Sequence, residues 1–362
     1  MNENVYNQLL EELNSGKKAI VITLLDSQKF ESKNSIKKTL ITEENLLNHN
    51  YISNFSQDVY EKSKYALETG TIQLLKTSEY QTYLIEPYFP QPSLIILGGG
   101  HIAKPLAEFG SKAGYSVTVI DDRPSFANST RFPTAEKVIC ESFEKCFNLV
   151  NLNQSTFVVI VTRGHRHDMH CLKEVLKHNT AYVGMIGSRR RVKAAMNQLI
   201  NEGYSQESLD RVCSPIGLDI GAVTPEEIAF SIIAEVIKYR RLNNKINNSA
   251  NHSKSTWPDF EQDVLTELCK EDNSPKSIVT IVSTKGSAPR KAGAKMLVYP
   301  SGKISGSIGG GCCEGEVINT ARYILKTGGY EFQAVDMTGD VAEDEGMVCG
   351  GIMDVIIEYF DK

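Results

Sequence analysis

Short apolar runs, each followed by glycine or polar residues, mark a series of strands in the middle of the chain. Residues 93–100 read SLIILGGG and lead into an amphipathic helix, after which a second apolar strand ends in Asp121 and Asp122. The runs TFVVIV at 156–161 and AYVGMIG at 181–187 are two further strands, each followed by a polar segment. Strands that alternate with helices in this way predict an α/β fold with a Rossmann-type, doubly wound sheet.

Two breaks in the apolar pattern divide the chain into three parts. The prolines of EPYFPQPS at 86–93 stop one segment, and the Asn- and Ser-rich stretch at 240–259 has the composition of a linker. The helix before this stretch is expected to begin with a capping box, in which Thr224 is the N-cap and Glu227 the N3 residue. We expect domains at 1–88, 93–240 and 257–362, with a linker over 241–256.

The two outer parts show the same order of apolar and polar segments. IVIT at 20–23 aligns with IVTI at 278–281, and ALETG at 66–70 aligns with ILKTG at 324–328, both 258 positions apart. Constant spacing favours a duplication over chance matches between short apolar strings. The first copy has none of the glycine-rich loops of the second, so we predict that 1–88 is a degenerate, structural copy. The predicted architecture is a Rossmann-type sheet flanked by two copies of a smaller α/β domain.

The middle domain carries a dinucleotide-binding pattern. Gly98, Gly100 and Ala103 fill G-x-G-x-x-A between a strand and a helix, and Asp121 ends the next strand. In a Rossmann fold the glycines admit a pyrophosphate at the helix start, and such an acid binds a ribose hydroxyl. These residues therefore predict a site for NAD(P) or another nucleotide, although a Rossmann fold can also bind neither.

Polar residues follow the next two strands at the same edge of the predicted sheet. His165, His167 and Asp168 follow one strand and Arg189 follows the other, so we expect ligand contacts here. The histidines allow two interpretations, because alternate histidines chelate a metal while histidines at the end of a loop serve as caps or hydrogen-bond donors.

The last domain has its most distinctive chemistry at 305–314, which reads SGSIGGGCCE. A helix is expected to begin near Cys312 or Cys313, and a thiol at a helix N-terminus has a lowered pKa. Arg290 offers a planar fork suited to phosphate. This combination indicates a soft metal centre with a phosphorylated organic ligand, or covalent thiol chemistry. The alternative is that the glycines form a sharp turn and the cysteines are small packed residues.

Composition excludes several classes of partner. The net charge is −5 with both signs interspersed, which gives no broad cationic surface for nucleic acid. No apolar run is long enough to span a membrane, and the N-terminus has no apolar signal core. Eight scattered cysteines fit reduced thiols, so we expect a cytoplasmic protein.

Several long motifs resemble those of a known family. GSAPRKAGAKM, GSIGGGCCE and GMVCGGIMDVIIE, in this order, resemble the XdhC/CoxI family of xanthine dehydrogenase accessory proteins. GGGHIAKPLA, VTRGHRHD, YVGMIGSRRR and SPIGLDIGAVTPEEIAFSIIAE resemble the Rossmann-type domain of that family. The resemblance covers about residues 93–360. Family members usually carry the cysteine-bearing domain first, whereas here the intact copy comes last.

The resemblance implies a chaperone for the molybdenum cofactor rather than a catalyst in its own right. Such proteins bind the molybdopterin cofactor, support replacement of an oxo ligand by sulfide, and deliver the product to a molybdenum hydroxylase apoenzyme. A cysteine desulfurase is a candidate sulfur donor. A homodimer is a candidate assembly, because a cofactor carrier would gain a shielded cleft from it.

The same resemblance implies roles for individual residues. Cys312 is the expected molybdenum ligand, with Cys313 as a surrogate and Cys349 as a second thiolate. Glu314 would orient a proton or cap the helix. The pterin phosphate, or an attached nucleotide, would suit Arg290 and the backbone N–H groups of Gly309, Gly310 and Gly311.

Two other functions stay open at this point. An NAD(P)-dependent oxidoreductase would use the Rossmann pattern, with His165 or His167 as the acid or base. A thiol-redox protein would instead couple Cys312 with Cys349.

Overall fold

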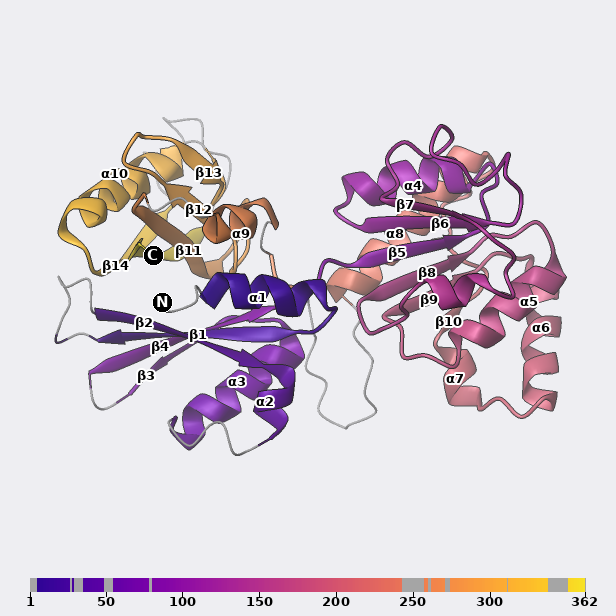
Figure 1. The fold of residues 1–362 in the computed structure, drawn as a ribbon, viewed down its shortest axis with the longest axis horizontal. Coiled ribbons are helices and arrows are strands. Elements are labelled where there is room, and N and C mark those ends of the chain that lie inside the picture. The colour runs from indigo at the N-terminus through magenta and orange to yellow at the C-terminus, as the bar shows by residue number, and fades with distance from the viewer. Residues whose placement is uncertain are drawn as a thin grey trace. The chain divides into compact units, whose positions relative to one another are not determined.

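The chain folds into two compact units in a computed structural model, shown in Figure 1. One unit combines Met1–Pro90 with Ser255–Lys362, and the other is Gln91–Lys254. The residues that the structure describes are 5–26, 28, 35–48, 55–77, 80–242, 257–259, 262–270, 274–310, 312–337 and 351–361.

The unit of residues 91–254 contains a six-stranded sheet in which all neighbouring strands are parallel. Its strands are β5 (Ser93–Leu97), β6 (Ser116–Asp121), β7 (Lys137–Cys140), β8 (Thr156–Ile160), β9 (Tyr182–Met185) and β10 (Val212–Cys213). They lie in the order β10-β9-β8-β5-β6-β7, so the chain starts in the middle and builds outward in both directions. This order confirms the predicted doubly wound Rossmann sheet.

Helices cover both faces of this sheet, as its apolar strands require. They are α4 (Ala103–Lys112), α5 (His165–Val175), α6 (Arg189–Asn201), α7 (Gln206–Asp210) and α8 (Pro225–Leu242). Residues of α5 and α6 share one core with Ile95 and Val158, whereas α4 packs on the opposite face against Leu94. The predicted capping box of α8 is present: Thr224 N donates to Glu227 Oε2 at 3.0 Å, and Glu227 N donates to Thr224 Oγ1 at 3.2 Å.

The other unit contains two antiparallel sheets. The first is built from α1 (Val5–Asn14), β1 (Ala19–Asp26), β2 (Ile36–Thr42), α2 (Glu43–Leu47), α3 (Gln57–Thr69), β3 (Gln73–Lys76) and β4 (Gln81–Tyr88). The second is built from α9 (Gln262–Cys269), β11 (Lys276–Lys285), β12 (Lys295–Val298), β13 (Ile304–Gly306), α10 (Cys312–Thr327), β14 (Tyr330–Asp336) and β15 (Ile352–Phe360). Their strand orders are β2-β1-β4-β3 and β13-β12-β11-β15-β14, so they match once β13 is set aside. We call these parts the N-terminal copy and the C-terminal copy.

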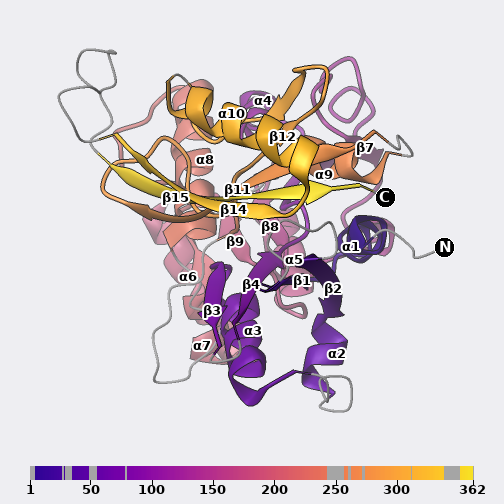
Figure 2. The same ribbon diagram turned by 90° about the vertical axis from the view of Figure 1, so that its left-hand side faces the viewer.

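The two copies pack through the faces of their sheets that point away from α3 and α10. Figure 2 shows α3 and α10 on the outer sides of the two sheets. The core between the copies takes Val21 and Tyr88 from one and Ile278 and Leu297 from the other, together with apolar residues of α1 and α9. Each sheet therefore buries one face against its own helix and the other against the second copy.

The strand alignment made from the sequence is wrong by one residue. It places Ile20 over Ile278, yet Ile20 packs on the α3 side of its sheet while Ile278 packs in the core between the copies. Val21 occupies the position equivalent to Ile278, since both lie in that core. Side chains alternate between the faces of a strand, so a shift of one residue exchanges the faces. The helix ends align as expected, because Gly70 and Gly328 both adopt left-handed conformations with φ of 70° and 78°.

Helix α8 extends through Leu242 and so includes the first two residues of the predicted linker; residues 243–256 lie outside the described part of the chain. Among the helices that the structure describes, none combines the length and the apolar content needed to cross a bilayer.

Candidate functional site

The glycine turn of the Rossmann unit has the predicted strand–turn–helix geometry. Gly98 follows β5 with a φ of 114°, and α4 begins at Ala103, which is buried. Gly100 has open space where a side chain would lie. At Gly99, however, a Cβ would come within 2.1 Å of the carbonyl oxygen of Phe126, so another part of the chain already lies against the turn.

Asp121, the predicted ribose ligand, ends β6 as expected but is buried and fully engaged within the chain. Its Oδ2 accepts from Gly99 N at 2.8 Å and from Arg123 Nη2 at 2.9 Å. Its Oδ1 accepts from Arg123 N at 3.0 Å and Arg123 Nε at 2.8 Å. A carboxylate has about four lone-pair sites. Asp121 therefore has no acceptor left for a ribose hydroxyl in this structure.

Burial by itself would raise the pKa of Asp121, but the hydrogen bonds from Arg123 and Gly99 outweigh burial and hold the pKa below its usual 3.8. The sequence interpretation missed Arg123, although its place two residues after the acid is the signal that would have revealed it.

A second arginine also contacts the glycine turn. Arg131 donates to Gly99 O at 3.0 Å and to Gly100 O at 3.2 Å. The guanidinium groups of Arg123 and Arg131 lie 3.8 and 5.1 Å from the centre of the Phe126 ring. The Arg131 side chain and the Phe126 carbonyl group therefore lie against the turn at which a Rossmann enzyme binds a pyrophosphate.

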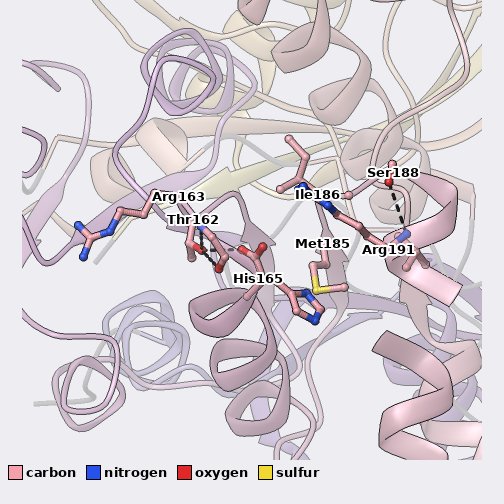
Figure 3. A pocket seen from close by; sticks show the side chains of 11 residues that line it. Thr162, Arg163, His165, Met185, Ile186, Ser188 and Arg191 are labelled. Carbon is pink, nitrogen blue, oxygen red and sulfur yellow. Dashed lines mark hydrogen bonds between the residues drawn. The ribbon is translucent and has the colours of Figure 1, made fainter. Parts of the chain in front are cut away.

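A cavity of about 310 Å³ lies instead at the carboxyl ends of β8 and β9. Figure 3 shows side chains that line it, among them Thr162 and His165 after β8 and Ser188 and Arg191 near the start of α6. The first turns of α5 and α6 both border the cavity, and the N–H groups at a helix start attract anions.

Two of the predicted ligand contacts after β8 line this cavity. His165 is the first residue of α5, and Asp168 accepts a hydrogen bond from the Thr162 hydroxyl at 2.6 Å. Burial raises the pKa of Asp168 above its usual 3.8. His167 instead packs against Phe143, with ring centres 5.2 Å apart and the ring planes tilted by 52°. No group of three or more His, Cys, Asp or Glu side chains suited to a metal occurs within the described ranges.

Arg189 begins α6 as the motif suggests, but its side chain is 88% exposed and lies 3.6 Å from Asp219. Arg191, two residues further on, lines the cavity in its place. The first turn of α6 contains Arg189, Arg190 and Arg191, and the positive end of the helix dipole repels their positive charges. A bound anionic group would offset this repulsion, so the cavity is suited to an anion.

In the C-terminal copy, α10 begins at Cys312 as predicted. Glu314 organises the glycine loop before it: its Oε1 accepts from Ser307 Oγ at 2.7 Å, Ile308 N at 3.0 Å and Gly310 N at 2.9 Å. Gly309 N donates to Ser307 Oγ at 3.0 Å. The N–H groups of Gly309 and Gly310, expected to bind phosphate, thus already have acceptors in Ser307 and Glu314.

The glycine-rich segments of this copy pack on one another. Gly309 has a φ of 145°, and a Cβ there would come within 2.5 Å of Pro289 Cγ. A Cβ at Gly351 would come within 2.4 Å of Ser287 O. The GSAPR segment therefore lies against both the glycine loop and Gly351, which directly precedes β15.

Arg290, expected to bind phosphate, is paired inside the chain. Its Nε donates to Asp259 Oδ2 at 3.3 Å, and its Nη2 donates to Asp259 Oδ1 at 3.4 Å. Gly311 and Cys349 lie outside the described residues, and the side chains of Cys312 and Cys313 are not described.

Substituting Glu314 by alanine is expected to increase the amide hydrogen-exchange rates of Ile308 and Gly310 by at least about tenfold, because both N–H groups lose their acceptor. Glu316→Ala, an exposed position on the same helix, is the matched control. Unchanged protection in the Glu314 variant would show that the carboxylate does not hold the loop.

Comparison with known proteins gives two family matches. Residues 94–236 match the model described as the XdhC Rossmann domain, and residues 269–336 match the model of the XdhC and CoxI family. The matched segments contain the glycine turn, the cavity and the glycine–cysteine loop.

Two curated proteins resemble parts of the chain. A Bacillus subtilis protein described as a probable xanthine dehydrogenase subunit is 31% identical over 172 residues, which are 48% of this chain and 50% of that protein. The uncharacterized protein YqeB of Escherichia coli is 30% identical over 151 residues, which are 41% of this chain and 28% of that protein. The matches to this chain thus span half or less of the length of these relatives.

A crystal structure of a xanthine dehydrogenase from Bacillus halodurans is 24% identical and covers 64% of this chain and 62% of its own, with a TM-score of 0.46. At this TM-score the likeness adds nothing to the assignment. The two family models together match more than half of the chain and fall on the motifs that carry the resemblance. The chain belongs to the XdhC and CoxI family.

Proposed function

We propose that this protein is a maturation factor for a molybdenum hydroxylase of the xanthine dehydrogenase type. Its cargo is the molybdenum cofactor in its molybdopterin form, which it binds, presents for sulfuration and delivers to the apoenzyme. Family membership supports an accessory role, and so does the likeness to a protein described as a probable component of xanthine dehydrogenase.

The observation that carries this proposal is the packing of the GSAPR segment against the glycine loop before α10 and against Gly351. Gly309 lies against Pro289, and Gly351 lies against Ser287. A Cβ at Gly310 would meet nothing within 4 Å, so this side of the loop is sterically open. A loop with this shape, directly before a helix that begins with cysteine, fits a cargo that approaches the backbone closely.

The metal of the cargo suits the chemistry of the helix start. The positive end of a helix dipole stabilises a thiolate, and a soft thiolate is a good ligand for molybdenum held by a dithiolene. Cys312 would hold the metal, with Cys313 as the surrogate and Cys349 as the second candidate thiolate. Glu314 would act through the loop by fixing Ser307 and Gly310.

The residues expected to bind the phosphate of the cargo are already engaged in contacts within the chain. The N–H groups of Gly309 and Gly310 already have acceptors, and Arg290 is paired with Asp259. Binding of a phosphate at these groups would have to replace those contacts. The proposal therefore draws no support from the phosphate.

No specific observation favours the alternative of an NAD(P)-dependent oxidoreductase. Asp121 has its acceptors filled, and Phe126 and Arg131 lie against the glycine turn. A nucleotide in the Rossmann unit is compatible with the maturation role, with the cavity beside Arg191 as the place that suits an anion.

Anaerobic reconstitution with molybdenum cofactor tests the proposal. After gel filtration, the wild-type chain is expected to retain molybdenum and pterin in near-stoichiometric amounts, and Cys312→Ala to retain them at least about tenfold more weakly. Cys140→Ala removes an exposed free thiol of the Rossmann unit and is expected to bind like the wild type. Equal retention by the wild type and by the Cys312→Ala/Cys349→Ala variant would rule out these two thiolates, and equal retention by a variant that also carries Cys313→Ala would rule out any thiolate ligand of this loop.

A further inference from the structure

Two pairs of oppositely charged side chains are buried between the N-terminal and C-terminal copies. Lys38 Nζ lies 2.8 Å from Glu358 Oε1, and the two side chains are 7% and 0% exposed. Lys295 donates to Glu86, and these side chains are 4% and 2% exposed. Ionic groups are costly to remove from water, so two buried pairs in one interface call for a specific reason.

The two pairs are related by the symmetry of the copies. Lys38 is opposite Thr23 in the first sheet and donates to its hydroxyl at 2.9 Å. Lys295 is opposite Thr280 in the second sheet and donates to its hydroxyl at 2.7 Å. Each copy thus holds its lysine in place with a threonine of its own sheet.

The glutamates follow the same rule. Glu86 is opposite Val21 and Glu358 is opposite Ile278, the two strand positions that are equivalent between the copies. Within the described residues, Oε2 of each glutamate has no hydrogen-bond partner, so the two glutamates match in this respect as well. Each copy therefore carries one lysine and one glutamate at matching positions, and each lysine reaches the glutamate of the other copy.

This exchange of contacts is the pattern of an isologous interface, in which residue i of one partner meets residue j of the other and j meets i. The surrounding apolar core is drawn from both copies in the same way, with Leu9 and Leu13 of α1 beside Val264 and Leu268 of α9. In interfaces of this kind apolar residues supply most of the affinity, and complementary charges favour one partner and one register over others.

We propose that this face is a self-complementary pairing surface of the fold and that its partner is a second copy of the same fold. In this chain the N-terminal copy supplies that partner from within the same polypeptide. The function of the N-terminal copy, which lacks the glycine–cysteine loop, is to occupy this face of the cysteine-bearing copy. The proposal is independent of the cargo.

Two double variants of identical composition test this directly in the full chain. Lys38→Glu/Glu358→Lys reverses one pair across the copies and keeps both contacts between opposite charges. Lys38→Glu/Glu86→Lys reverses both charges within the N-terminal copy. It then opposes two carboxylates at one contact and two ammonium groups at the other.

In the second variant each copy is still complementary to the same copy of another chain. We therefore expect it to pair between chains and to show twice the molar mass of the wild type in light scattering, with an unfolding midpoint that depends on concentration. The first variant is expected to keep the wild-type mass and midpoint. Two variants with the same mass and the same midpoint would overturn the proposal.

Should the second variant fail to fold, double-mutant cycles with Lys38→Met, Glu358→Gln and Glu86→Gln decide instead. The coupling of Lys38 with Glu358 is expected to exceed its coupling with Glu86 by at least about tenfold in the unfolding equilibrium constant. Equal couplings would show that the lysine does not select the other copy, and the proposal would be wrong.

Discussion

Replacing Lys295 with alanine is expected to lower the free energy of unfolding of the two-copy unit by about 3–5 kcal/mol. The substitution leaves Glu86 charged and buried without its cation, and it removes the donor to the Thr280 hydroxyl. Urea unfolding followed by tryptophan fluorescence measures this, because Trp257 is the single tryptophan. Its indole N–H donates to Pro90 O at 3.1 Å. Its emission therefore reports on the contact between the two chain segments that form this unit.

Lys17→Ala is the control for this prediction. Lys17 is an exposed lysine of the same unit that lies 4.0 Å from Glu12, and its loss is expected to cost no more than about 1 kcal/mol. Lys295→Met/Glu86→Leu should recover most of the lost stability, because an apolar pair avoids the desolvation of two charges. If Lys295→Ala lowered the free energy of unfolding by no more than Lys17→Ala does, the buried Glu86 would not need its lysine for stability.

Replacing Asp121 with alanine is expected to destabilise the Rossmann unit by about 2–3 kcal/mol. The change removes the acceptor of Gly99 N and of three N–H donors of Arg123. Circular dichroism during thermal unfolding gives the stability, and hydrogen exchange at Gly99 localises the effect. Asp122→Ala is the adjacent control, because Asp122 pairs with an exposed arginine, Arg163, and its loss is expected to cost about 0–1 kcal/mol.

This difference should also depend on pH. The pKa of Asp121 is held below 3.8, so its carboxylate contributes stability that is fully present above that pH. The contribution is lost as the pH falls through the lowered pKa of the folded state. The gap between the wild type and Asp121→Ala should therefore narrow in strong acid, and a gap that stayed constant with pH would exclude the charge as its source.

Much of the fold follows from local patterns in the sequence. The strand–glycine–helix pattern around Gly98, the capping box at Thr224 and the start of α10 at Cys312 all appear as predicted. Each depends on residues within a few positions of one another. The predicted alignment of the two copies is wrong by one residue over the strands, because short apolar strings fit in either register and only packing shows which face is buried.

The candidate site was harder to predict than the fold. Gly98 lies in the expected turn and His165 lies at the expected edge of the Rossmann sheet. The charged residues of the candidate site, however, have partners that the sequence does not reveal. Arg290 pairs with Asp259, and Arg191 takes the place expected for Arg189 beside the cavity. The sequence shows that a charge is present; it does not show what lies opposite that charge after folding.

The sequence by itself determined the order of strands and helices, the glycine turns and the membership of the motifs in one family. It did so because periodic burial and helix capping are local properties that neighbouring residues encode. The tertiary structure decided that Arg123 donates its hydrogen bonds to Asp121 and that Lys38 pairs with Glu358, 320 positions away. Contacts of the second kind arise only when two faces meet, and burial then makes their pairing decisive.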